Sequence, residues 1–134
     1  MKVFVDSNIP MYVAGADHPH KSPSRRFLEQ VRSGKLEACT STEVLQEILH
    51  RYSSLGRREL ARDVYDLFVS ICPVVLSVTL ADTDRARDLL SSHPGISSRD
   101  AVHAAVMLNH GVEKIATFDT GFDGITGVKR LRLT

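Results

Sequence analysis

A chain of 134 residues, 43% of them hydrophobic and 25% charged, has the length and composition of one globular domain and can fold without disulfide bonds. A net charge of +1 gives no general attraction to nucleic acid, although it would not reveal an acidic pocket inside a basic rim. No apolar run approaches the length of a membrane span, and Cys39 and Cys72 share no metal-ligand spacing. We therefore expect a cytoplasmic protein with two buried thiols.

Short apolar runs alternate with longer amphipathic stretches along the whole chain. Strands are expected over residues 2–5, 36–40, 74–78 and 114–118, and residues 128–133 could form a fifth. Helices are expected over residues 8–14, 22–33, 42–52, 57–71, 80–92 and 98–109. This order predicts an α/β fold, with a mainly parallel sheet and helices on both of its faces.

The carboxyl ends of the strands are the part of such a fold where function is expected. Right-handed crossovers bring these ends to one edge of the sheet, and active sites lie outside that edge, near the point where the strand order reverses. Asp6 directly follows the first strand, and Asp119 ends the fourth. Each could instead be an ordinary turn or helix-capping aspartate.

Two further carboxylates lie on helices between these strands. Glu47 is at the border of its helix's apolar stripe, where a side chain can lean into a cleft, whereas Glu43 lies nearly opposite the stripe and should face water. The alternative for Glu47 is an i,i+4 pair with Arg51. Asp100 is in the first turn of a helix that is apolar nearly all round. It should therefore have a cation or several hydrogen-bond donors, unless it only complements the helix dipole.

Carboxylates gathered at one edge would repel one another unless protons or cations neutralise them. Oxygen ligands suit a hard divalent cation, so we interpret Asp6, Glu47, Asp100 and Asp119 as metal-binding and catalytic residues for phosphodiester hydrolysis.

Three neighbours of these carboxylates have supporting roles in this interpretation. Asn8 and Thr117 are candidates to hydrogen-bond and orient the carboxylates. Asp123 is either a third such residue or an ordinary loop charge.

Other reaction classes lack their motifs. The chain has no HExxH spacing, no GxSxG nucleophile elbow and no GxxxxGK[ST] phosphate loop. His103 lies one turn after Asp100, and His50 lies near Glu47, so either histidine could touch the pocket. We do not expect a histidine to bind the metal.

Four short motifs, in order along essentially the whole chain, resemble those of PIN-domain nucleases. They are Asp6-Ser7-Asn8, Ser41–Glu47, Ser98–Ala105 and Thr117–Asp123. The acidic residues of the motifs fall on Asp6, Glu47, Asp100 and Asp119. The length and the lack of appended domains resemble the toxin subunits of VapBC toxin–antitoxin pairs.

That resemblance implies a three-layer α/β/α sandwich, with residues 1–134 forming one nuclease domain. It also implies a Mg²⁺- or Mn²⁺-dependent endoribonuclease that hydrolyses RNA phosphodiester bonds, is usually a homodimer and is inhibited by a cognate antitoxin protein. Arg99 is then the first candidate to bind the RNA substrate. Only 6% of the residues are aromatic, so we expect phosphate contacts to dominate and no aromatic stacking surface.

Two other classes of protein remain open at this point. One is a catalytically silent PIN-like module that binds RNA or a partner protein, although all four expected carboxylates are present. The other is a receiver-like phosphoacceptor domain, which also places aspartates around Mg²⁺ at strand ends. The receiver interpretation needs a lysine at the end of a late strand, and Lys114 is at the wrong end of its strand.

Overall fold

The computed structural model describes residues 2–134. Its strands are β1 (Lys2–Val5), β2 (Glu37–Ser41), β3 (Val74–Leu76), β4 (Lys114–Ala116) and β5 (Lys129–Arg130). Its helices are α1 (Asn8–Ala14), α2 (Lys21–Arg32), α3 (Thr42–Ser54), α4 (Arg58–Ile71), α5 (Leu80–Ser92) and α6 (Ser98–Asn109), with the 3₁₀ turn η1 (Thr120–Phe122) after β4. The elements follow the alternation expected from the sequence.

The strands form one sheet in the order β3-β2-β1-β4-β5, and every neighbouring pair is parallel. β1 is the central strand, and its residues Val3, Phe4 and Val5 are fully buried. A continuous apolar run is typical of a strand that is covered on both faces. The chain builds outward from β1 through β2 and β3 and then returns to add β4 on the other side of β1. The strand order therefore reverses beside β1, where a binding crevice is expected.

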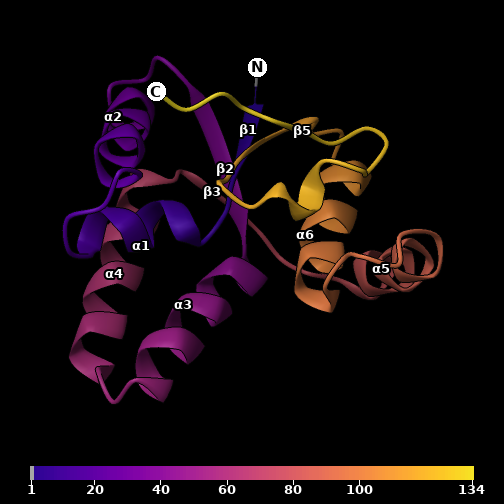
Figure 1. Cartoon of the computed structure of the whole chain (residues 1–134), viewed down its shortest axis with the longest axis horizontal. Coiled ribbons are helices and arrows are strands. Elements are labelled where there is room, and N and C mark those ends of the chain that lie inside the picture. Colours follow the sequence, from indigo (N-terminus) through magenta and orange to yellow (C-terminus); the bar gives the residue numbers. More distant parts are fainter. Residues whose placement is uncertain (1) are drawn as a thin grey trace.

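Helices cover both faces of the sheet. Figure 1 shows α1, α2 and α4 on one side of the strands and α5 and α6 on the other, with α3 packed against α4. This arrangement is the predicted three-layer α/β/α sandwich. The final residues run back to α2, where Arg26 Nε donates a hydrogen bond to the Thr134 carbonyl oxygen at 2.8 Å.

Serine caps fix the starts of the two helices that carry Glu47 and Asp100. Ser41 Oγ accepts a hydrogen bond from Val44 N at the start of α3, and Ser97 Oγ accepts one from Asp100 N at the start of α6. Such caps satisfy backbone N–H groups that the first helical turn leaves without partners. Both helices therefore begin at defined positions relative to the sheet edge.

Three strands are shorter than the sequence suggests. β3 ends at Leu76, and the N–H of Val78 then donates to Thr42 Oγ1 rather than to a neighbouring strand. β4 ends at Ala116, because the next side chain, Thr117, turns into the hydrogen-bond network described below. β5 is reduced to two exposed residues that pair only with β4.

The buried thiols agree with the sequence-based expectation. Cys39 and Cys72 are free and buried, and burial raises their pKa values to about 11 and about 12. They therefore pack as small apolar side chains rather than as reactive thiolates. Across residues 2–134, no helix has both the length and the apolar character needed to cross a membrane.

Candidate active site

The site begins where β1 and β4 end side by side. Val5 lies opposite Ala116 in the parallel register, so the next residues, Asp6 and Thr117, are neighbours at the carboxyl edge. Thr117 Oγ1 donates a 2.7 Å hydrogen bond to Asp6 Oδ2, and Ser7 N donates a 2.7 Å bond to Asp6 Oδ1. Both carboxylate oxygens of this buried aspartate are therefore held in fixed positions.

The Thr117 hydroxyl connects three segments of the chain. It accepts hydrogen bonds from Asn8 Nδ2 at 2.9 Å and from Asp119 N at 3.0 Å, while its own hydrogen goes to Asp6. These contacts join the end of β1, the first turn of α1 and the turn after β4. Thr117 thus contacts Asp6 directly and Asn8 contacts Thr117, and a role of either residue in orienting metal ligands stays a prediction.

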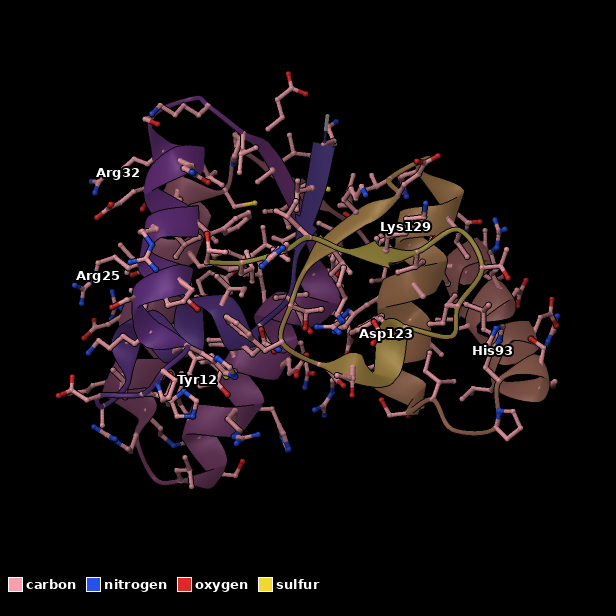
Figure 2. All side chains as sticks on the ribbon, turned by 45° about the horizontal axis from the view of Figure 1, so that its top comes forward. Tyr12, Arg25, Arg32, His93, Asp123 and Lys129 are labelled. Atoms are coloured by element: carbon pink, nitrogen blue, oxygen red, sulfur yellow. The ribbon has the colours of Figure 1, made fainter. Side chains whose placement is uncertain are left out.

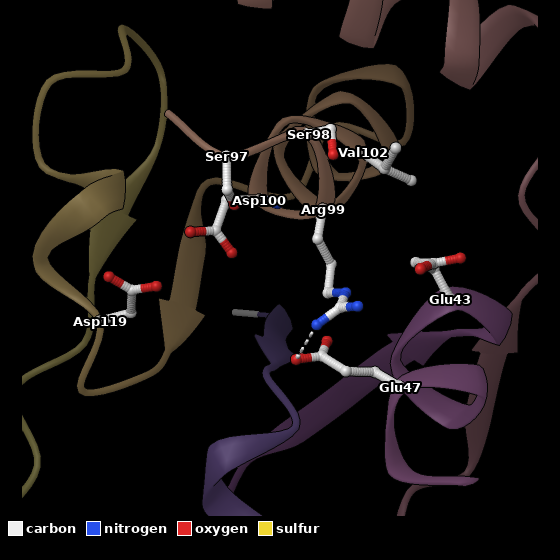
Figure 3. Close-up of a pocket in the computed structure, with 8 residues that line it drawn as sticks. All are labelled: Glu43, Glu47, Ser97, Ser98, Arg99, Asp100, Val102 and Asp119. Atoms are coloured by element: carbon white, nitrogen blue, oxygen red, sulfur yellow. Dashed lines mark hydrogen bonds and ion pairs between the residues drawn. The ribbon is translucent and has the colours of Figure 1, made fainter. Parts of the chain in front are cut away.

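Glu47 reaches the site from α3 and meets two basic side chains of α6. His103 Nε2 lies 3.1 Å from Glu47 Oε1 and 3.7 Å from Asp6 Oδ1. Arg99 Nη1 lies 3.6 Å from Glu47 Oε2, and Figure 3 shows the Arg99 side chain directed at this carboxylate. Glu47 therefore does not form the pair with Arg51 that the sequence left open as its alternative.

Asp100 and Asp119 face each other on the other side of the site (Figure 3). A Cβ added to Gly121 would lie 3.0 Å from Asp119 Oδ1 and 3.3 Å from Asp100 Oδ2. Only glycine at this position therefore avoids crowding the two carboxylate oxygens. Burial, together with a hydrogen bond to Asp119 and repulsion from its charge, raises the pKa of Asp100 to about 7. The two carboxylates therefore compete for positive charge or a proton.

Burial and neighbouring charges also shift the pKa values of Asp6, His103 and Glu47. Burial raises the pKa of Asp6, and the charge of His103 and the Thr117 hydrogen bond only partly oppose this. Burial alone would lower the pKa of His103, but its hydrogen bond to Glu47 and the charge of Asp6 raise it. Burial alone would raise the pKa of Glu47, but the hydrogen bond and charge of His103 lower it.

All four predicted carboxylates line one open pocket of about 340 Å³. The full lining is Asp6, Ser7, Asn8, Met11, Tyr12, Glu47, Arg51, Asp100 and Asp119. Arg99 lines an adjoining pocket together with Glu43, Glu47 and Asp100. Asp123 lines neither pocket and is paired with Arg130, at 2.6 and 3.0 Å, so the structure favours the loop-charge alternative for this residue.

Sequence reasoning underestimated His103. This residue of α6 is fully buried, and its Nε2 atom contacts Glu47 on α3. The contact exists because the two helices pack together. One ligand atom each from Asp6, Glu47 and His103 lie within 4.8 Å of one another. The available signal was the spacing of three residues after Asp100, which puts both side chains on one face of α6.

The low aromatic content did not lead us to expect the cluster of rings that the structure contains. Tyr12, His18, His20 and Phe118 form a cluster of rings at the edge of the pocket, with His20 stacked on Phe118 at a centroid separation of 3.8 Å. A low overall aromatic content does not prevent local clustering when the loop after α1 and the turn after β4 fold together. Two of the four rings are histidines, which the count of aromatic residues omits.

The donor set fits a divalent cation. Four carboxylates converge from four segments, and the oxygen ligands they offer are those that hard cations prefer. Burial and the neighbouring Asp119 raise the pKa of Asp100, and Asn8 Oδ1 is buried with no hydrogen-bond partner within residues 2–134. These observations are consistent with a cation among the carboxylates and with further ordered ligands around it.

A parallel α/β/α sandwich with an acidic pocket where its strand order reverses is typical of Mg²⁺-dependent proteins, metal-dependent nucleases and receiver-like domains among them. The PIN domain model matches residues 3–128. The chain is 45% identical to VapC ribonuclease Mb1869c of Mycobacterium bovis over 96% of this chain and 98% of the relative, and 38% identical to Ribonuclease VapC23 of Mycobacterium tuberculosis over 87% and 92%. The crystal structure of VapBC2 from Rickettsia felis, bound to a promoter DNA fragment, gives a TM-score of 0.78 at 17% identity and full coverage of both chains. The chain belongs to the PIN-domain family, in its VapC ribonuclease branch.

Proposed function

We propose that this protein is a divalent-metal-dependent endoribonuclease that acts as the toxin of a VapBC-type pair. The observation that carries the proposal is the convergence of Asp6, Glu47, Asp100 and Asp119 on one pocket at the carboxyl edge of the sheet. The 45% identity to a VapC ribonuclease over nearly the whole chain supports the same activity.

The same four carboxylates would hold the cation, which we propose to be Mg²⁺ or Mn²⁺. When bound, the cation supplies positive charge that stabilises the phosphate in the transition state and lowers the pKa of nearby water. Thr117 and Asn8 keep the Asp6 carboxylate in place, and His103 keeps Glu47 directed into the site.

Arg99 is our candidate for phosphate binding. Its side chain is 43% exposed and lies beside Glu47 at the junction of the two pockets, so its remaining N–H groups are accessible to a substrate. Guanidinium groups match phosphate oxygens well, which makes this position suited to orienting the RNA backbone.

The decisive experiment is cleavage of mixed RNA by the purified chain with Mg²⁺ or Mn²⁺. We expect cleavage to stop with a chelator and to fall by about 100-fold or more in Asp6→Asn and Asp100→Asn, because several kcal/mol of charge stabilisation are lost. The matched control is Asp123→Asn, which removes a carboxylate that binds Arg130 outside the pocket and should keep most of the activity.

Two outcomes would contradict the proposal. Equal cleavage by wild type and Asp6→Asn would mean that the activity comes from a contaminant or from another site. RNA binding without metal-dependent cleavage would indicate the catalytically silent binding module instead. In cells, we expect growth inhibition by the wild type and its relief by Asp100→Asn.

The remaining expectations concern assembly. We propose that a cognate antitoxin protein binds and inhibits the chain in the cytoplasm and that the free toxin is a homodimer. The family match over residues 3–128 supports our interpretation of residues 1–134 as a single nuclease domain. Co-expression with any small reading frame found beside the gene, followed by co-purification, tests the partner, and light scattering of the free chain tests the oligomeric state.

A further inference from the structure

The four rings of Tyr12, His18, His20 and Phe118, here called the ring cluster, are held together by mutual contacts. His20 and Phe118 are stacked with an interplanar angle of 8°. Tyr12 packs edge-on against both of them, at 5.1 and 5.5 Å, and lies 4.7 Å from His18 at an angle of 32°. The rings come from α1, from the loop before α2 and from the turn after β4, so the cluster is a tertiary feature.

The ring cluster is continuous with the acidic pocket. Tyr12 lines that pocket together with the four carboxylates, and Phe118 stands between Thr117 and Asp119 in the chain. Figure 2 shows Tyr12 on the α1 side of the molecule. His18, at the other end, is exposed. A flat group beside the site could therefore contact the Tyr12 and His18 end of the cluster.

Positive charge lies just beyond the exposed end. His18 lines a second hollow together with Lys21 and Arg25, in which Asp17 is the only acidic side chain. Figure 2 shows Arg25 projecting outward from α2. Arg51 also lines the acidic pocket. The carboxylate pocket, the ring cluster and the basic hollow thus adjoin one another. This arrangement suits a nucleic-acid strand, in which charged phosphates alternate with flat bases.

We propose that the ring cluster is a base-stacking subsite, in which an unpaired nucleobase next to the cleaved phosphate packs against Tyr12 and His18. This inference rests on the proposed ribonuclease function, because it needs RNA in the acidic pocket. The subsite requires the target to be single-stranded at this nucleotide, since a paired base cannot offer its face to protein rings. Stacking accepts any base, so the subsite selects an unpaired conformation rather than a sequence.

The first test measures stacking without cleavage. A short single-stranded RNA carrying one 2-aminopurine binds to the Asp100→Asn protein, and stacking on the rings should quench the fluorescence of the probe. We expect Tyr12→Leu to remove the quenching and weaken binding by about tenfold. The matched control Tyr65→Leu changes a half-buried tyrosine of α4 outside the cluster and should leave both signals unchanged.

An exposed-residue variant covers the case in which Tyr12→Leu does not fold. His18→Ala alters an exposed side chain and should reduce the quenching in a folded protein, whereas His50→Ala, an exposed histidine of α3, should not. Unchanged quenching and affinity in His18→Ala, and in Tyr12→Leu if it folds, would overturn the subsite.

The second test combines a change in the protein with a change in the RNA and measures cleavage by the active enzyme. Replacing the stacked nucleotide of a cleaved RNA with an abasic one should lower kcat/KM of the wild type about tenfold, with little further loss in Tyr12→Leu. Equal effects of the abasic change in both proteins would overturn the subsite and leave the ribonuclease function intact. No cleavage of any RNA, with quenching preserved, would instead overturn the nuclease function while retaining the base-binding surface.

Discussion

Thr117 illustrates how one hydroxyl can organise a charged site. It donates to Asp6 Oδ2 and accepts from Asn8 Nδ2 and the N–H of Asp119, which uses its full hydrogen-bonding capacity. A buried carboxylate without such partners would be costly and would change its orientation or protonation. The hydroxyl is therefore well placed to support cation binding without touching the cation itself.

We predict that Thr117→Val lowers divalent-metal affinity by about 10- to 100-fold, because residues that orient ligands typically contribute this much. Isothermal titration with Mn²⁺ measures the affinity directly. The control is Thr40→Val, which removes another buried hydroxyl, one that donates to the Val5 carbonyl oxygen at 3.0 Å on the neighbouring strand. It should cost stability but leave metal affinity unchanged, and equal losses in both variants would contradict the role assigned to Thr117.

Glu47 and Glu43 provide a second comparison, one helical turn apart on α3. Glu47 contacts His103 and Arg99, whereas Glu43 lines only the adjoining pocket. We predict that Glu47→Gln lowers the rate of RNA cleavage by about tenfold or more in single-turnover measurements, while Glu43→Gln changes it by less than about twofold. Similar losses in the two variants would show that the contacts of Glu47 do not distinguish it.

At the scale of elements, the helix starts decide where the functional side chains lie. Ser41 and Ser97 begin α3 and α6, and α5 begins after Thr79, whose backbone N–H and hydroxyl both donate to Asp82. Asp82 Oδ2 accepts from Thr79 N at 2.9 Å and from its hydroxyl at 3.1 Å, while Asn109 Nδ2 donates to Asp82 Oδ1 at 2.8 Å. This last bond ties the start of α5 to the end of α6, the helix that carries Asp100.

We predict that Asp82→Asn destabilises the protein by about 1–2 kcal/mol, because an amide NH₂ must then face one of these donors. Burial alone would raise the pKa of Asp82, but the bonds from Asn109 and Thr79 lower it below its ordinary value. The stabilisation is therefore present above the unfolded-state value and disappears as the pH falls through the lower folded-state value.

Urea denaturation at neutral pH and near pH 3 checks both parts of this prediction. The difference between wild type and Asp82→Asn should shrink at the acidic pH. Asp84→Asn, an exposed position on the same helix, is the control and should differ little from wild type at either pH. A difference that persists in acid would mean that the amide substitution acts through packing rather than through charge.

For the whole molecule, the sequence was sufficient to predict the order of elements and the edge at which function lies. Hydrophobic periodicity is local, and parallel topology then brings Asp6 and Asp119 together without further information. The contact between Glu47 and His103, which are 56 positions apart, depends on how α3 packs against α6. The ring cluster likewise depends on the path of a loop, which neither periodicity nor composition determines.

The site also places a cost on the stability of the whole fold. Asp6, Asp100 and Asp119 are held close together by β1, α6 and the turn after β4, and burial together with their mutual repulsion raises the pKa of Asp100. Functional sites commonly retain such unfavourable arrangements at the expense of stability. A bound cation relieves the repulsion, so metal binding and folding stability should be linked.

We predict that Asp100→Asn raises the Tm of the chelator-treated protein by about 3–5 °C, corresponding to roughly 1 kcal/mol for a domain of this size. Adding Mn²⁺ should raise the Tm of the wild type in proportion to the logarithm of its concentration above Kd, and the variant should lose most of this gain. Differential scanning calorimetry measures both effects, with Asp63→Asn on the exposed face of α4 as a control that changes neither. A variant that is less stable than wild type in chelator would show that Asp100 stabilises the fold. Repulsion among the carboxylates would then not lower the stability of the metal-free protein.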